Sequence, residues 1–279
     1  MRKNKLTWTM DADDLGGEAR GVRRLTREDL GVVFQPIVEI ASGRAFAFEA
    51  LVRCKDPDYP SPPQLFDAAV KEDACGRLGR LIREVAFATC GDVTLFVNLH
   101  PQELSSHWLV QPDDPIGFHS KPVYVEITET STLTHFDLCM GVLKELGRRV
   151  GARLVIDDFG AGYSNLERVV DLEPSIVKLD LALTRDIQRH KSKQTVVRHM
   201  VNMCRELGAG VVAEGVETVE EFHCIRDLGV ELAQGYLLAR PAAPPPRHAW
   251  PLAERAAPSS RRPTNPALKK KSKAPAPRR

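Results

Sequence analysis

Two kinds of segment alternate along this sequence, and that alternation limits its fold more than any other feature. Short apolar, β-branched runs predict strands at 32–38, 45–53, 95–99, 123–128, 153–157, 175–180, 210–214 and 231–236. Between most of them lie amphipathic stretches with apolar residues at helical spacing, such as 138–149 and 194–208. Strands that alternate with helices in this way predict a closed, TIM-like (β/α)8 barrel of the α/β class. A doubly wound open sheet is the alternative architecture.

One connection between predicted strands is too short for this pattern. Segments 32–38 and 45–53 are separated only by the residues EIASGR. A parallel crossover needs a dozen or more residues, so these two segments are predicted to form an antiparallel hairpin. Ser42 and Gly43 supply the turn signal. We therefore expect an irregular barrel in which one strand runs against the others.

Charge is distributed unevenly along the chain. The formal net charge is +2, but residues 242–279 carry +9 and residues 1–241 carry −7. The last segment is also rich in proline, a composition that cannot offset its ordering entropy by apolar burial. We expect a flexible segment at 1–26, a folded barrel at 27–241 and a disordered basic, proline-rich tail at 242–279. The tail either aids solubility or binds an anionic partner, such as nucleic acid, a membrane surface or an acidic protein.

The sequence carries no signal for a membrane or for secretion. No window approaches the run of roughly 18 apolar residues that a membrane span needs. The first residues lack the apolar region of a signal peptide. The six cysteines are scattered without a CxxC pair, which is typical of reduced thiols rather than of a disulfide framework or a zinc site. We expect a soluble protein of the cytoplasm.

Polar side chains gather at the carboxyl ends of the predicted strands, where barrels of this class place their active sites. They are Glu49, Asn98, Glu126, Asp157, Asp158, Lys178, Glu214 and Gln234. Any one of them alone is compatible with an ordinary polar residue near a loop. Their occurrence on seven separate strands indicates a functional site.

The composition of this set points to metal chemistry. Carboxylates that converge on one barrel mouth repel each other, and some stay protonated unless cations intervene. Oxygen ligands without clustered Cys or His favour Mg²⁺ or Mn²⁺. Adjacent Asp157 and Asp158 suit a site in which one carboxylate bridges two ions, and two ions can promote phosphoryl displacement. With Lys178 and Arg53 as fixed positive charges for a phosphate, the residues predict metal-assisted phosphodiester hydrolysis.

A DFG triplet lies in the segment DDFGAGYSNL at 157–166. This triplet is typical of protein kinases, but neither an HRD-type catalytic loop nor a glycine-rich nucleotide loop accompanies it. Gly160 and Gly162 instead predict a flexible loop over the barrel mouth, or simply a tight turn.

Eight short motifs follow one another along the chain: QPIV (35–38), EALVR (49–53), VNL (97–99), EITET (126–130), DDFGAGYSNL (157–166), KLD (178–180), AEGVET (213–218) and QGYLLARP (234–241). They resemble, in the same order, the motifs of the EAL-domain cyclic di-GMP phosphodiesterases. The resemblance implies a (β/α)8-type barrel with one antiparallel strand. It also implies hydrolysis of cyclic di-GMP to linear pGpG in bacterial signalling, and a homodimer. Because nothing resembles a cyclase or sensory domain, we expect a stand-alone EAL domain.

The resemblance also implies roles for individual residues. Glu49, Asn98, Glu126 and Asp157 would hold one metal, and Asp157 and Asp158 the second, with Glu214 nearby as a ligand or water-orienting base. The catalytic set would be Glu49, Asp158, Lys178 and Glu214. Gln35, Leu51, Arg53 and Gln234 match substrate-binding positions. Glu129, Asp180 and Glu217 match supporting acids, the first of which secures the flexible loop.

Three other functions remain open at this point. The first is a non-catalytic cyclic di-GMP receptor or interaction protein that uses the same pocket, although every metal position is filled here. The second is an enolase-like barrel, which normally needs a capping domain that the residues before the first strand cannot supply. The third is an interaction protein that acts through its tail. His100 and Cys54 depart from residues that are frequent in the family, and they bear on substrate fit more than on chemistry.

Overall fold

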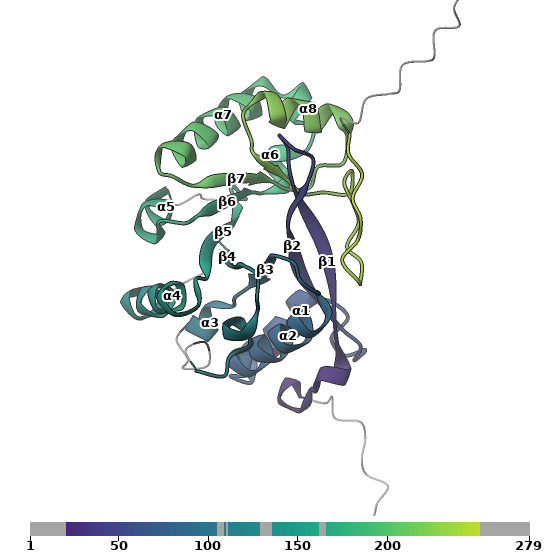
Figure 1. Cartoon of the computed structure of the whole chain (residues 1–279), viewed down its shortest axis with the longest axis vertical. Coiled ribbons are helices and arrows are strands. Elements are labelled where there is room, and N and C mark those ends of the chain that lie inside the picture. Colours follow the sequence, from purple (N-terminus) through teal and green to yellow (C-terminus); the bar gives the residue numbers. More distant parts are fainter. Residues whose placement is uncertain (1–20, 105–108, 110, 129–135, 162–165, 252–279) are drawn as a thin grey trace, which may run out of the picture.

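Eight strands close into one barrel, in sequence order, in a computed structural model that describes residues 21–104, 109, 111–128, 136–161 and 166–251 (Figure 1). The strands are β1 (Leu30–Glu39), β2 (Ala45–Cys54), β3 (Leu95–Asn98), β4 (Val123–Thr128), β5 (Arg153–Phe159), β6 (Ile176–Leu179), β7 (Gly210–Ala213) and β8 (Leu232–Ala233). The predicted closed barrel is therefore confirmed, and the open sheet is excluded. Each predicted strand coincides with an observed one, although β8 is much shorter than predicted.

Helices connect most of the strands and surround the barrel (Figure 1). They are α1 (Pro62–Lys71), α2 (Cys75–Thr89), α3 (Pro101–Leu104), α4 (Phe136–Val150), α5 (Leu166–Leu172), α6 (Leu181–Thr184), α7 (Lys191–Glu206) and α8 (Val219–Asp227). Short 3₁₀ helices are η1 (Val22–Arg24), η2 (Arg27–Asp29), η3 (Pro115–Phe118) and η4 (Ile187–Arg189). None of the helices in the described part of the chain is long and apolar enough to cross a membrane.

The predicted hairpin is present and makes the barrel irregular. β1 pairs antiparallel with β2, from Leu30 opposite Cys54 to Val38 opposite Ala45, and it also pairs antiparallel with β8. The remaining neighbours in the barrel pair in parallel. Gly43 closes the hairpin with a φ of +70°, a left-handed conformation that glycine adopts at little cost. The short connection between β1 and β2 thus decides the direction of one strand.

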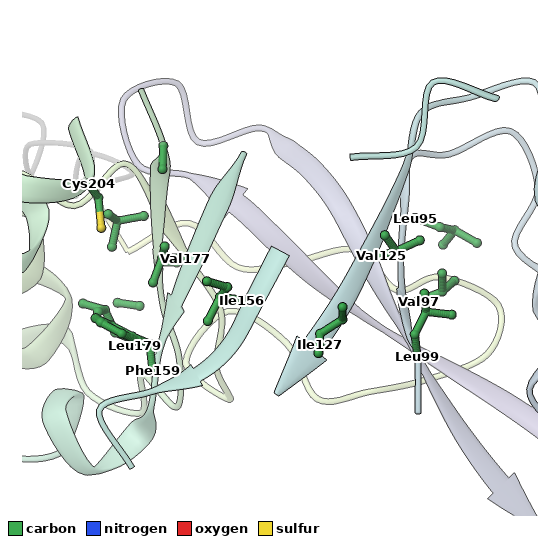
Figure 2. Close-up of a cluster of buried hydrophobic side chains, with 14 of the residues drawn as sticks. Leu95, Val97, Leu99, Val125, Ile127, Ile156, Phe159, Val177, Leu179 and Cys204 are labelled. Carbon is green, nitrogen blue, oxygen red and sulfur yellow. The ribbon is translucent and has the colours of Figure 1, made fainter. Parts of the chain in front are cut away.

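Apolar side chains fill the barrel interior in one layer, to which every strand contributes one residue. The layer consists of Ile37, Ala47, Phe96, Tyr124, Val155, Ile176, Val212 and Leu232. The intervening residues of each strand point outward into the larger core between the barrel and its helices. Figure 2 shows this outer core, with Leu95, Val97 and Leu99 of the β3 region on the same side. The period of two along each strand therefore separates an inner core from an outer one.

The described fold extends past both predicted limits of the barrel domain. Val22 and Leu25 are buried against α1 and α2, before the predicted start at residue 27. After residue 241, Ala242 pairs with Phe34 of β1 through backbone hydrogen bonds of 2.8 and 3.0 Å. The parts of the predicted flexible segment and tail that fall on 1–20 and 252–279 lie outside the described residues.

A C-terminal strap, residues 242–251, lies along β1 (Figure 1, yellow). Its Trp250 ring packs edge-on against Phe222 of α8 at 5.5 Å between centroids. The same ring lies under the hairpin turn, where a Cβ atom at Gly43 would be 2.6 Å from it. A turn rather than a helix joins β1 to β2, so no crossover helix covers the barrel wall at this connection. The strap covers part of the wall there instead.

Candidate active site

Polar and charged side chains form a ring one layer above the apolar interior of the barrel. In the seven parallel strands the ring residue comes two positions after the interior residue, as in Phe96 and Asn98. In the reversed strand β1 it comes two positions before, as Gln35 does relative to Ile37. Side chains two apart share a face, so all of these residues point into the same end of the barrel. The ring is Gln35, Glu49, Asn98, Glu126, Asp157, Lys178, Glu214 and Gln234.

Lys178 of β6 lies at the centre of this ring and is only 1% exposed. Its Nζ atom contacts four carboxylates from other strands: Glu214 at 2.7 Å, Glu126 at 2.8 Å, Asp157 at 2.9 Å and Glu49 at 3.4 Å. Burial alone would lower the pKa of this ammonium, but these acids, led by Glu126, raise it well above its usual value. Lys178 is therefore a permanent positive charge in the middle of the acids.

Side-chain amides orient Glu49 of β2. Asn98 Nδ2 donates to Glu49 Oε1 at 3.2 Å, and Gln234 Nε2 donates to Glu49 Oε2 at 2.7 Å and to Gln35 Oε1 at 3.2 Å. Gln35 in turn donates to the Ala239 carbonyl at 3.1 Å. Although burial acts to raise the pKa of Glu49, the charge of Lys178 and these amide hydrogen bonds lower it. Glu49 is thus held as a carboxylate in a fixed orientation.

Three other acids bind protons more tightly than isolated carboxyl groups do, because one ammonium cannot neutralise all of them. Burial, and then the neighbouring charge of Glu49, raise the pKa of Glu126 well above its usual value. Burial is also the main cause that raises the pKa of Glu214 to about 8 and that of Asp158 to about 6. These three raised pKa values agree with the repulsion expected among carboxylates at the barrel mouth. The site can accept further positive charge.

Two groups of acids at this end of the barrel could hold metal ions. In the first, Glu49, Glu126 and Asp157 each offer an oxygen within 4.8 Å of the others. In the second, Asp157, Asp158 and Glu214 do the same, so the two groups share Asp157. Among the described residues, Glu126 Oε2 meets no hydrogen-bond donor, and Glu126 Oε1 and Asp157 Oδ1 meet only the Lys178 ammonium. Buried carboxylate oxygens without donors are suitable ligands for hard divalent cations.

An irregularity at the end of β5 brings adjacent aspartates to one site. Consecutive residues of a regular strand point to opposite faces. The register of β5 against β6 shifts between Ile156 and Phe159, and Asp158 adopts a φ of +56°. An aspartate tolerates this left-handed conformation better than most residues. The shift lets Asp157 face the interior while Asp158 also reaches the second group of acids.

Two cavities open beside the ring, and Glu49 and Leu51 line both of them. The first, of about 250 Å³, is also lined by Gln35, Glu214 and Gln234. The second, of about 320 Å³, lies between β2, β3, α1 and α2, with Asn98 and Arg53 at its wall. Leu51 therefore forms a ridge between two compartments of one cleft.

The remaining predicted site residues lie around the cleft rather than in the ring. The Arg53 guanidinium is exposed and donates to the Val52 carbonyl at 2.7 Å. Asp180 caps α6 by accepting from the Ala182 amide at 2.7 Å. Glu217 pairs with Arg185 at 2.6 Å. Glu129 lies outside the described residues, as does part of the predicted loop at 157–166.

Two residues that line the first cavity, Arg185 and Tyr236, were not predicted as site residues from the sequence. Both side chains are half exposed, and the Arg240 guanidinium lies 4.3 Å from the centre of the Tyr236 ring. Tyr236 belongs to the motif at 234–241, which could have drawn attention to it. Arg185 lies outside every motif, at the end of α6, and its side chain reaches the cleft by pairing with Glu217.

Comparison with known proteins agrees with this geometry. Residues 19–241 match the family described as EAL domain. The cyclic di-GMP phosphodiesterase RocR of Pseudomonas aeruginosa is 30% identical over 253 residues, which cover 86% of this chain and 64% of RocR. The cyclic di-GMP phosphodiesterase PdeR of Escherichia coli is 29% identical over 232 residues, which cover 78% of this chain and 35% of PdeR. The chain thus spans less than two thirds of the length of these relatives.

Solved structures show the same fold. The Klebsiella pneumoniae protein BlrP1, in a complex with manganese and cyclic di-GMP, superposes with a TM-score of 0.68 at 37% identity. That match covers 79% of this chain and 57% of BlrP1. A standalone EAL protein of Vibrio cholerae bound to cyclic di-GMP gives a TM-score of 0.61 at 26% identity. That match covers 79% of this chain and 96% of the Vibrio cholerae protein. The match to the family over most of the chain, together with the ring of acids at the strand ends, shows that this chain belongs to the EAL domain family.

Proposed function

We propose that this chain is a phosphodiesterase that hydrolyses one phosphodiester bond of cyclic di-GMP and releases linear pGpG. The observation that carries the proposal is the position of Asp157, which belongs to both groups of acids beside the buried Lys178 ammonium. Similar proteins support the choice of substrate. RocR and PdeR are named as cyclic di-GMP phosphodiesterases, and BlrP1 was solved with manganese and cyclic di-GMP.

The donor set favours Mg²⁺ or Mn²⁺ as the bound metals. Glu49, Asn98, Glu126 and Asp157 would hold one ion, and Asp157, Asp158 and Glu214 the other. Two such ions would lower the pKa of a bound water and stabilise the charge on the leaving oxygen. Oxygen ligands of this kind suit hard cations, and the raised pKa values of Glu126 and Glu214 mark a site that lacks positive charge.

The chain's own residues would orient the reactants and handle the proton. Lys178 stays charged and holds four carboxylates in place, which keeps the ligand geometry fixed before substrate arrives. Glu214 lies at the edge of the first cavity, where its carboxylate can orient a water and accept its proton. Asp158, next to Asp157, completes the proposed catalytic set.

The cleft would bind the substrate along the ridge formed by Leu51. Gln35 and Gln234 lie on one side of the ridge, and Arg53 lies on the other, where its exposed guanidinium can reach a phosphate. Glu129, Asp180 and Glu217 would support the loops around the cleft. A cyclic dinucleotide has two bases, which two compartments on either side of Leu51 can accommodate.

Hydrolysis can be tested directly. The purified chain, cyclic di-GMP and Mg²⁺ or Mn²⁺ should yield pGpG on chromatography, and Glu49→Gln should abolish the product while preserving the fold. Binding of cyclic di-GMP without any product would contradict the proposal and would indicate a receptor instead.

We further propose that the protein acts in the cytoplasm as a homodimer and lowers the level of cyclic di-GMP. All six cysteines are free thiols, which agrees with a reducing compartment. The net charge of +9 over residues 242–279 supports an anionic partner for the tail. Sedimentation at several protein concentrations tests the dimer, since a monomer at all of them would exclude it.

A further inference from the structure

We propose that a buried ion pair outside the ring, between Arg83 of α2 and Glu103 of α3, positions Asn98 on its side of the active site. Its kinetic consequence rests on the proposed function, whereas its structural consequence does not. Arg83 is a positioning residue here, because it acts on the ring through Glu103 and the backbone of His100.

The cluster around Arg83 is fully enclosed. Arg83 is 1% exposed, and its Nη1 atom lies 2.6 Å from Glu103 Oε2. On its other side, Nη2 lies 2.8 Å and Nε 3.3 Å from the two carboxylate oxygens of Asp114. One guanidinium therefore joins α2 to α3 and to the segment that precedes η3. Buried charges are costly unless they are paired in this way, so the geometry of the cluster is tightly constrained.

Glu103 transmits this constraint to the end of β3. Its Oε2 atom contacts Arg83, while its Oε1 atom accepts a hydrogen bond from the His100 amide at 3.0 Å. The Glu103 amide donates back to the His100 carbonyl at 2.8 Å. His100 follows Asn98 by two residues. These contacts among Arg83, Glu103 and the His100 backbone form a clamp. The clamp holds the chain directly after Asn98.

The clamp also shapes the second cavity. Arg83 lines this cavity together with Asn98 and Glu49. The His100 ring stacks on Phe66, another residue of its wall, with 5.8 Å between centroids and 11° between planes. Displacement of His100 would therefore change both the position of Asn98 and the wall beside it. Small displacements matter, because a misplacement of about 1 Å can cost roughly 10²-fold in rate.

Gly79 makes the clamp possible. It lies one helical turn before Arg83 on α2, and a Cβ atom there would be 2.0 Å from Glu103 Oε2. No side chain fits in that space unless Glu103 moves. Glycine weakens a helix interior, so its presence in the middle of α2 requires a reason. The close approach of Glu103 supplies that reason.

The test variant is Gly79→Ala, which displaces Glu103 without removing a charge. The matched control is Gly141→Ala in the interior of α4, where an added Cβ meets no neighbouring atom within 4 Å. Hydrogen exchange on the metal-free protein should show faster exchange at the Leu99 and His100 amides in Gly79→Ala and no change in Gly141→Ala. Unchanged exchange at these amides in Gly79→Ala would overturn the proposal, whether or not the chain hydrolyses cyclic di-GMP.

The metal dependence gives a second measurement. In Gly79→Ala the Mn²⁺ concentration for half-maximal hydrolysis should rise by about tenfold, which is typical when the support of a metal ligand is lost. Leu146→Ala in the core of α4, where Leu146 is 4% exposed, destabilises the fold away from the site. An equal shift in Leu146→Ala would show that general loss of stability is the cause and would overturn the proposal.

Discussion

The Lys178 ammonium lies 2.8 Å from the Glu126 carboxylate, and each of these two residues is only 1% exposed. An ammonium that is enclosed in this way cannot leave the ring to meet a substrate in solvent. Its charge instead acts on the ring itself, where it offsets part of the repulsion among the carboxylates. The effect of Lys178 on catalysis should therefore be on the reaction step rather than on substrate capture.

Lys178→Ala should lower kcat by at least ~10²-fold, as is typical when a preorganised charge is lost. The reason is that four carboxylates lose the cation that holds them together. Steady-state kinetics with cyclic di-GMP and saturating Mn²⁺ measures the effect. A rise in KM at unchanged kcat would instead assign Lys178 to ordinary substrate binding.

Hydrolysis should require Mg²⁺ or Mn²⁺ and should stop when a chelator is added. The two acid groups that share Asp157 offer oxygen ligands only, as these cations prefer. Ca²⁺ should inhibit, because it favours longer bonds and more ligands in the same site. Product formation is followed by chromatography at fixed substrate. Full turnover in excess chelator would show that no metal takes part.

The metal-free protein should lose stability as the pH rises between about 4.5 and 8. The folded-state pKa of Glu214 is about 8, above its ordinary value of 4.5, so folding takes up a proton in this window. Below the window the carboxyl is protonated in both states, and above it the folded state bears an unfavourable charge. One such group contributes a slope of at most about 1.4 kcal/mol per pH unit. Urea unfolding at several pH values, in the presence of a chelator, measures the slope.

Glu214→Gln is the control for this pH dependence, because the amide has the same shape and does not titrate. The free energy of unfolding of this variant should vary less with pH over the same window. If the variant and the parent protein show equal slopes, other groups account for the dependence and the assignment to Glu214 is wrong.

Removal of the C-terminal strap should destabilise the barrel, whereas removal of the segment after it should not. Truncation after Pro251 keeps the backbone pair between Ala242 and Phe34 and the packing of Trp250 on Phe222. Truncation after Pro241 removes both. A loss of about 2 kcal/mol in the free energy of unfolding lowers the melting temperature of a domain of this size by roughly 4–8 °C. Equal melting temperatures for the two truncations would restrict the folded domain to the predicted limit at residue 241.

Two glycines provide a matched test of the same strap. Gly43 and Gly91 have φ values of +70° and +72°, so alanine strains the backbone similarly at both. Only at Gly43 would the new Cβ meet Trp250, whereas Gly91 faces open space. Gly43→Ala should therefore lower the melting temperature more than Gly91→Ala does. The opposite order would show that Trp250 contributes little.

Binding to anionic vesicles should depend on the basic segment at 252–279 and should weaken steeply as salt rises. This segment carries most of the positive charge of the tail, with six basic residues from Lys269 to Arg279. Cosedimentation with vesicles of anionic and of neutral lipid compares the full chain with the truncation after Pro251. Equal binding of the two proteins to anionic vesicles would assign the interaction to the barrel.

The sequence by itself determined the barrel and the members of the ring. Periodicity of two places Phe96 inside the barrel and Asn98 one layer above it, and the same offset holds along every parallel strand. The short connection before Ala45 could only be a hairpin, so the reversed strand was also predictable. These features depend on spacing within one segment, and local spacing is what a single sequence displays.

Only the tertiary structure decided which of these residues touch, and what lies around them. Lys178 and Glu49 are 129 positions apart in the chain, yet they are 3.4 Å apart in the barrel. Arg83, Arg185 and Trp250 lie outside the recognised motifs, and their neighbours come from other helices and strands. The burial of an ammonium, the clamp behind Asn98 and the strap along β1 arise when distant segments pack together, because packing sets both the distance between charges and their access to water.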